Sequence, residues 1–211
     1  MIGRVINYLR RKKNEFHARL NSKKAIRQWE KNGRPLPPPH NYKISIISKY
    51  KKASGYKLFI ETGTYLGDMV YAQLNNFSKI YSIELGEDLY RNAVQKFQQF
   101  PHVKILPGNS GKVLAELMKN IHEPAIFWLD GHYSGGITAK GEKECPIYEE
   151  LDCIFNAGRF DHILLIDDAR CFVGTVDYPT VKELTGYILE RNPAATIDVE
   201  NDIMRIQLKH S

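Results

Sequence analysis

The sequence predicts an α/β fold with a doubly wound, mostly parallel sheet of seven strands, a C-terminal antiparallel hairpin and an N-terminal helical arm. Five apolar strand patterns alternate with helical patterns, which is typical of parallel strands covered by helices on both faces. The last two strand patterns have no helix between them, so they indicate a hairpin. The 211 residues, 43% of them apolar, are enough for one domain with a substantial core.

The N-terminal arm is basic. Residues 1–34 contain eleven Lys or Arg and two Glu, a net charge of +9, whereas the whole chain carries +6 and the remainder therefore −3. Ile2, Val5, Ile6 and Leu9 recur at helical spacing and predict an amphipathic helix. Such a helix could dock to an anionic membrane surface or to a partner, or it could pack on its own domain or on a second subunit.

A proline-rich segment follows the arm. Pro35 and Pro37–Pro39 cannot continue a helix, because proline lacks the amide donor and clashes with the preceding turn. We therefore expect residues 1–40 to form the arm and its linker, and residues 41–211 to form a catalytic domain.

The strands and helices of that domain are expected in alternation. The five parallel strands are predicted at Lys57–Glu61, Lys79–Glu84, Val103–Leu106, Ala125–Asp130 and His162–Asp167. Helical patterns follow these strands at residues 65–75, 87–99, 110–121, 146–157 and 180–190. Thr196–Glu200 and Ile203–Leu208 then flank Asn201-Asp202 and complete the hairpin.

The turn after the first strand carries the most informative motif. It has the pattern Glu-x-Gly-x-x-x-Gly over residues 61–67, and Glu84 ends the next strand 23 residues after Glu61. Dinucleotide-binding turns need G-x-G-x-x-G, whereas this turn has two glycines and an acid. The acid would repel a pyrophosphate but suits a cationic ligand without phosphate, such as S-adenosylmethionine (SAM). Glu84 could accept hydrogen bonds from both ribose hydroxyls, although this spacing also fits nicotinamide enzymes.

These motifs, together with the final hairpin, resemble the class I SAM-dependent methyltransferases over residues 57–208, which implies a Rossmann-like fold. Ser110 has an alternative role, because a serine at that place is a good helix N-cap. The cofactor-binding residues that we predict are Glu61, Thr62, Gly63, Thr64, Tyr65, Gly67, Glu84, Asn109 and Ser110.

Three aspartates follow the fourth and fifth strands. Asp130 and the pair Asp167-Asp168 should converge, because adjacent parallel strands lie about 4.8 Å apart. A divalent cation such as Mg²⁺ would relieve their repulsion, since oxygen ligands suit hard cations. The alternative is that the pair is an ordinary strand end.

The layout resembles the metal-dependent macrocin- and mycinamicin-type sugar O-methyltransferases, in which an Asp-Gly turn and a later acid pair hold Mg²⁺ and a nearby histidine is the proposed base. The resemblance implies Asp130 and His132 as catalytic residues and Asp130, Asp167 and Asp168 as metal ligands. Asp130-Gly131-His132 is one residue shorter than the Asp-Gly-Ser-His of that family.

A long polar loop at residues 131–146 is a candidate lid over the site. Glu149 and Glu150 fit the electrostatics of the next helix better than catalysis. Three tyrosines, Tyr133, Tyr148 and Tyr178, could contact a sugar.

We therefore predict a SAM-dependent methyltransferase that acts on a hydroxyl of a sugar or secondary metabolite, with a small-molecule or glycan acceptor. The alternatives are a non-catalytic Rossmann-like scaffold and an RNA methyltransferase that uses the basic arm, although the mildly acidic body argues against nucleic acid. A nicotinamide oxidoreductase fits least. We also expect a homo-oligomer.

The cysteines and the apolar runs bear on location. Cys145, Cys153 and Cys171 form no C-x-x-C pair and are odd in number, which favours a reduced cytoplasmic protein. No apolar run approaches the ~20 residues that cross a bilayer. Contact with a membrane would thus be peripheral, through the arm.

Overall fold

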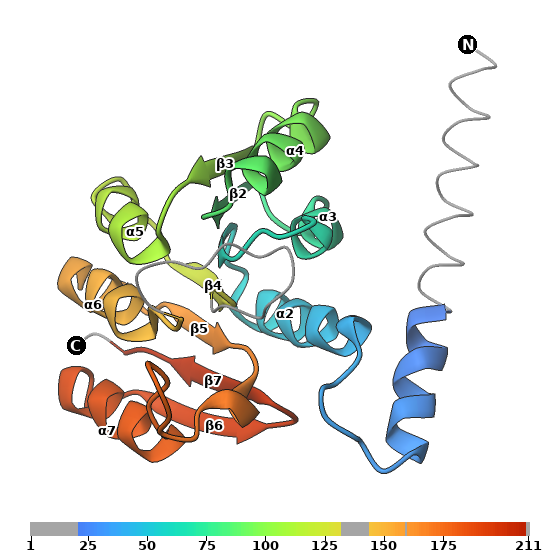
Figure 1. Ribbon diagram of the computed structural model, residues 1–211, viewed down its shortest axis with the longest axis vertical. Helices are drawn as coiled ribbons and strands as arrows, with labels where there is room; N and C mark the ends of the chain where they lie inside the picture. The colour runs from blue at the N-terminus through green and yellow to red at the C-terminus, as the bar shows by residue number, and fades with distance from the viewer. Residues whose placement is uncertain (1–20, 132–143, 159, 210–211) are drawn as a thin grey trace. The chain divides into compact units, whose positions relative to one another are not determined.

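The structure is a computed structural model that describes residues 21–131, 144–158 and 160–209. The chain forms two compact units, which divide between Ile46 and Ile47. The α-helices labelled in Figure 1 are α2 (His40–Ser54), α3 (Asp68–Gln73), α4 (Glu87–Phe97), α5 (Ser110–Met118), α6 (Ile147–Ala157) and α7 (Val181–Arg191), and a short 3₁₀ helix, η1, spans Ala169–Cys171. The strands are β1 (Leu58–Thr62), β2 (Lys79–Glu84), β3 (Val103–Pro107), β4 (Ala125–Leu129), β5 (Ile163–Ile166), β6 (Thr196–Glu200) and β7 (Ile203–Gln207).

The seven strands form a single sheet in the order β3-β2-β1-β4-β5-β7-β6. The first five strands are parallel, whereas β7 pairs antiparallel with β5 and β6 pairs antiparallel with β7. The predicted sheet and its final hairpin are therefore confirmed. The strand order reverses between β1 and β4, and ligands of open α/β sheets bind outside the carboxyl ends of the strands at such a point.

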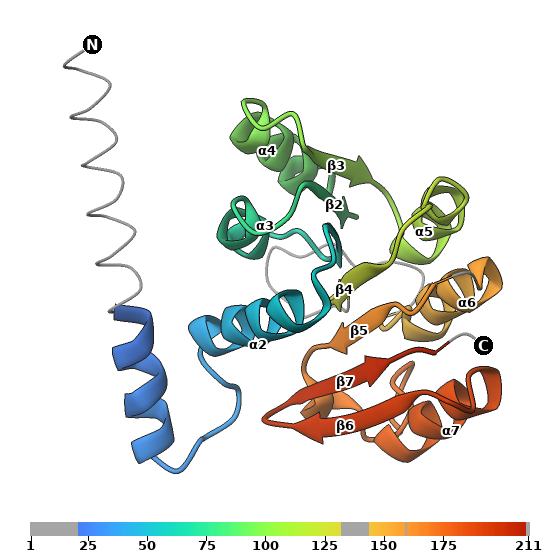
Figure 2. The ribbon, with the colours of Figure 1, turned by 180° about the vertical axis from the view of Figure 1, so that it is seen from behind.

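Helices cover both faces of the sheet, as Figures 1 and 2 show. One face packs against α5, α6 and α7 and contributes the main apolar cluster, which includes Ile60, Phe127 and Leu164. The helices α3 and α4 lie on the other side. Every residue of β1 and β4 is buried, because both faces of these central strands are covered.

The N-terminal unit is described from residue 21. Residues 21–31 are helical, and the proline segment after them contains no helix. Trp29 is buried in this unit, donates its indole N–H to the Pro35 carbonyl at 2.8 Å and stacks near Tyr42 at a centroid distance of 4.7 Å. The predicted helix from Ile2 to Leu9 lies outside the described residues.

Two features of the fold differ from the sequence prediction. The helix α2 covers residues for which the sequence predicts no element, because the apolar residues of this segment do not recur at a clear helical spacing. The helix after the first strand begins at Asp68 rather than residue 65, since Tyr65 and Gly67 adopt left-handed backbone conformations with φ values of 49° and 73°. Among the described helices, none has the length and apolar character that a membrane span requires.

Candidate functional site

The turn after β1 is built on a glycine that no other residue could replace without strain. Gly63 has a φ of 83°, and a Cβ added there would lie 2.3 Å from the Asp130 carbonyl oxygen. The amides of Gly63 and Thr64 both donate to the Ile83 carbonyl, at 3.0 and 3.2 Å, and this ties the turn to β2. The absence of a Cβ lets the turn lie directly against the end of β4.

Glu61 ends β1 as a buried carboxylate beneath this turn. The Ser82 hydroxyl donates to Glu61 Oε2 at 2.5 Å, and it lies 2.6 Å from the Thr64 hydroxyl. Burial raises the pKa of Glu61 well above its usual value, and the negative charges of Asp130 and Glu84 raise it further. A cationic ligand group at this position would reverse that effect, because an opposite charge favours the ionised carboxylate.

Glu84 lies at the carboxyl end of β2 and is also buried. Its Oε2 accepts the Tyr65 amide at 2.7 Å, and its Oε1 accepts the Gly86 amide at 2.8 Å. The carboxylate therefore fixes the turn after β1 as well as the loop after β2. Since an ionised carboxylate has about four acceptor positions, these two bonds leave capacity for two ligand hydroxyls.

The loop after β3 lies beside Glu84, because the Gly108 amide donates to the Glu84 carbonyl at 2.8 Å. Asn109 is the N-cap of α5, and its side chain accepts the Lys112 amide at 3.3 Å. Ser110 is the first residue of the helix and is buried. The capping role that we considered for Ser110 thus belongs to Asn109.

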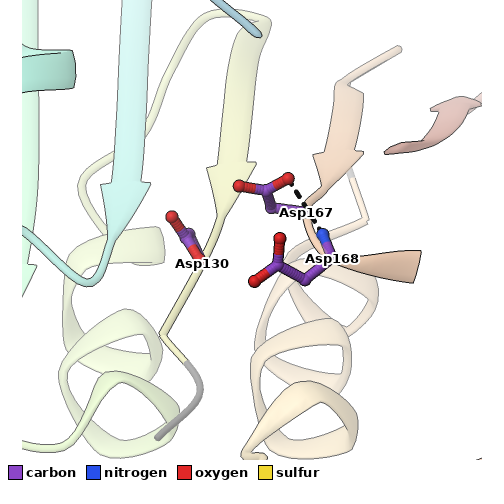
Figure 3. A group of neighbouring side chains, drawn as sticks. All are labelled: Asp130, Asp167 and Asp168. Atoms are coloured by element: carbon purple, nitrogen blue, oxygen red, sulfur yellow. Dashed lines mark hydrogen bonds between the residues drawn. The ribbon is translucent and has the colours of Figure 1, made fainter. Parts of the chain in front are cut away.

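The three predicted acidic residues come together. The ligand oxygens of Asp130, Asp167 and Asp168 lie within 4.8 Å of one another. Figure 3 shows Asp130 after β4 and the other two after β5, with their side chains facing a common space. The Asp130 amide donates to the carbonyl and to the hydroxyl of Thr62, both at 3.2 Å, so the end of β1 positions this residue. An all-oxygen donor set of this kind suits Mg²⁺, Mn²⁺ or Ca²⁺.

Sequence reasoning missed two residues beside the acidic cluster. Arg170 donates from Nη1 to Asp168 Oδ1 at 2.8 Å, and the same guanidinium pairs with Asp202 of the β6–β7 turn. Arg170 follows the acid pair by two residues, and this spacing only weakly indicates that it contacts the acidic cluster. Asp202 is distant in the chain, and no sequence pattern links it to the site.

Lys96 is a third residue that the sequence did not reveal. Its Nζ lies at the C-terminal end of α4 and donates to the Leu66 carbonyl at 2.6 Å, while the carboxylate of Asp68 is 3.3 Å away. Lys96 therefore holds the turn after β1 at Leu66, one residue after the amide that Glu84 accepts.

The remaining predicted positions have mixed outcomes. His132, Tyr133 and most of the proposed lid lie outside the described residues. Glu149 and Glu150 are in the first turn of α6, and Glu150 is buried. Tyr148 packs on Tyr187 of α7 at a centroid distance of 4.5 Å, while Tyr178 packs on Phe172 at 5.8 Å.

The comparisons with known proteins concern the fold. The sequence matches no protein-family model and no curated protein. Among solved structures, it is similar to the O-methyltransferase TomG from Streptomyces achromogenes, involved in tomaymycin synthesis and solved with SAM (TM-score 0.60, 14% identity, 90% of this chain and 89% of that chain).

Two further structures are similar to the same extent. One is an O-methyltransferase from Bacillus cereus in complex with SAH (TM-score 0.58, 13% identity, 89% of this chain and 90% of that chain). The other is the SAH-bound methyltransferase PaMTH1 from Podospora anserina (TM-score 0.59, 13% identity, 94% of this chain and 96% of that chain). The chain therefore has the Rossmann-like methyltransferase fold with its C-terminal antiparallel hairpin.

Proposed function

We propose that this protein is a SAM-dependent O-methyltransferase that acts on a hydroxyl of a sugar or other secondary metabolite, assisted by a divalent cation. The observation that carries the proposal is the arrangement of Glu61, Gly63 and Glu84 at the point where the strand order reverses. The solved structures of similar fold include O-methyltransferases with SAM or SAH bound, which supports the same donor.

The residues of the turn fit the donor. SAM would supply an electrophilic methyl group on its sulfonium. Gly63 provides a surface without a side chain, and the buried Glu61 would become ionised beside the ammonium of the methionine portion and pair with it. Glu84 would accept hydrogen bonds from the ribose hydroxyls, and the loop of Asn109 and Ser110 would face the adenine.

The acidic cluster fits the acceptor side. Asp130, Asp167 and Asp168 would hold a divalent cation, which would polarise the acceptor hydroxyl. The acceptor hydroxyl must be aligned with the methyl–sulfur bond and must lose its proton. We assign His132 as the base that accepts this proton, with the help of Asp130. The chain reads Asp-Gly-His-Tyr after β4 rather than the Asn/Asp-Pro-Pro-Tyr/Phe signature of amino-methylating enzymes, which favours an oxygen acceptor.

The test is isothermal titration of S-adenosylhomocysteine into the full-length protein, with and without Mg²⁺. We expect binding by the wild type and at least tenfold weaker binding by Glu84→Gln, which keeps the size of the side chain but not its charge. Glu87→Gln, an exposed position in the first turn of α4, is the matched control and should bind normally. Absence of binding in the wild type would refute the proposal.

An acceptor screen follows if the donor binds. Methyl transfer to a sugar-bearing or other small hydroxyl compound, with loss of activity on chelation of the cation, would support the full proposal. RNA is the competing acceptor, because residues 1–34 are strongly basic. Methylation of RNA, with binding that weakens steeply as the salt concentration rises, would favour that alternative.

A further inference from the structure

Asp202 occupies an unusual place for an aspartate. It is the second central residue of the two-residue turn between β6 and β7, where Glu200 pairs with Ile203. Asn201 and Asp202 both have positive φ values, 50° and 69°. Asn-Gly and Asp-Gly are the favoured sequences for such a turn, because glycine adopts this conformation without strain. The aspartate therefore adopts a backbone conformation that glycine would adopt more easily.

The side chain of Asp202 is fully buried and makes specific contacts with the loop after β5. Its Oδ1 accepts the Arg170 amide at 2.8 Å, and its other oxygen pairs with the Arg170 guanidinium. The Asp202 carbonyl also accepts the Ala169 amide, at 2.9 Å. One residue of the hairpin thus holds the neighbouring loop by its backbone and by its side chain.

These contacts lead to the acidic cluster. Arg170 donates from Nη1 to Asp168 Oδ1 at 2.8 Å, and the Asp168 amide donates to Asp167 Oδ1 at 2.9 Å. Asp168 itself has a φ of 54°, so its backbone needs support from neighbouring groups. The order of contacts is therefore Asp202, Arg170 and then Asp168, at the edge of the space that the three aspartates share.

The charges have a clear consequence. Arg170 carries a positive charge beside a cluster that we expect to bind a cation, and this charge by itself would oppose cation binding. Asp202 offsets that charge, because its carboxylate accepts from the same Nη1 that donates to Asp168. Without Asp202, the full charge of Arg170 would act on Asp168, and the guanidinium, which already donates to Asp168 Oδ1, would compete more strongly with the cation for this carboxylate.

We propose that Asp202 is a positioning residue, which acts through Arg170 to present Asp168 to the divalent cation held with Asp130 and Asp167. The inference rests on the proposed function, because it requires that cation. The competing explanation is that Asp202 only stabilises the hairpin.

The experiment measures Mn²⁺ binding to the full-length protein, from the electron paramagnetic resonance signal of unbound Mn²⁺. We expect Asp202→Asn to bind Mn²⁺ about tenfold more weakly than the wild type. Asp202→Gly should weaken Mn²⁺ binding to a similar degree, although glycine suits the backbone of the turn better and should preserve the stability of the protein. Asn201→Gly, in the same turn, is the control and should bind like the wild type. The Tm of each variant shows whether weaker Mn²⁺ binding comes from an unfolded hairpin or from the loss of the Asp202 carboxylate alone.

The outcomes are distinct. Wild-type affinity in Asp202→Asn and Asp202→Gly, with Mn²⁺ bound by the wild-type protein, would overturn the inference and leave the proposed function intact. No Mn²⁺ binding by the wild type would overturn both the inference and the metal assistance in the proposed function. In an Arg170→Gln background, Asp202→Asn should have little further effect, because the two residues act in series. A full tenfold loss in that background would contradict the inference.

Discussion

Gly63→Ala should disrupt the fold and the site together. Two costs arise from the structure. A residue with a Cβ at φ 83° incurs about 1–2 kcal/mol of backbone strain. The Cβ would also lie 2.3 Å from the Asp130 carbonyl oxygen, whereas ordinary contact begins at 3.4 Å, so one backbone must move by about 1.1 Å. Overpacking of this kind costs about 1–3 kcal/mol.

The two costs add to about 2–5 kcal/mol. For a chain of this size, each kcal/mol lowers Tm by about 2–4 °C, so we expect Tm to fall by about 4–20 °C. The control is Gly55→Ala. Gly55 is in the same compact unit, has a φ of 75° and has no atom within 4 Å of an added Cβ, so only the backbone strain applies. Its Tm should fall by about 2–8 °C.

The assays are thermal unfolding and titration with S-adenosylhomocysteine. Gly63→Ala should lose ligand affinity by at least tenfold, because the displaced turn no longer lies against the end of β4. Gly55→Ala should bind the ligand like the wild type. Equal Tm values for the two variants, or wild-type affinity in Gly63→Ala, would refute the reasoning, because either result would mean that the contact with Asp130 is not restrictive.

Three further predictions concern other parts of the molecule. Burial raises the pKa of Glu61, so binding of a cationic ligand should release the proton of the Glu61 carboxyl, and ligand affinity should fall as the pH falls below that raised pKa. Glu61→Gln should remove this pH dependence. Titrations in two buffers of different ionisation enthalpy check the proton release, and equal binding heats in the two buffers would contradict it. Lys96→Met removes the bond to the Leu66 carbonyl and should weaken S-adenosylhomocysteine binding about fivefold by titration, whereas Arg91→Met, at an exposed pair on the same helix, should not. Thr180→Ala removes the capping box of α7 and should cost about 1 kcal/mol in thermal unfolding, with ligand affinity unchanged.

The sequence was sufficient for the parts of the fold that depend on local patterns. Buried parallel strands are mostly apolar, and the acids at or just after their last residues mark the carboxyl edge of the sheet, so Glu84 and Asp130 could be placed at that edge. The hairpin was equally clear, since two alternating runs flank Asn201-Asp202. In each case the information lies within about ten residues of the chain.

The sequence was insufficient where contacts depend on distant residues. Arg170 and Asp202 are 32 positions apart, and nothing in the local pattern of either residue indicates the other. The same holds for Lys96, which contacts Leu66 across 30 positions. The late start of α3 has a similar origin, because the hydrogen bond from the Tyr65 amide to the Glu84 carboxylate favours an irregular turn over another helical turn.

These distant contacts join the two halves of the proposed site. Gly63 lies against the carbonyl of Asp130, and the Asp130 amide is held by Thr62, so the donor turn and the first acid of the cluster share one backbone arrangement. Methyl transfer requires the acceptor oxygen to lie in line with the methyl–sulfur bond, and small misplacements cost large factors in rate. A change in the turn should therefore reduce turnover even at saturating donor. Separate donor and acceptor subsites would instead predict a loss of donor affinity alone.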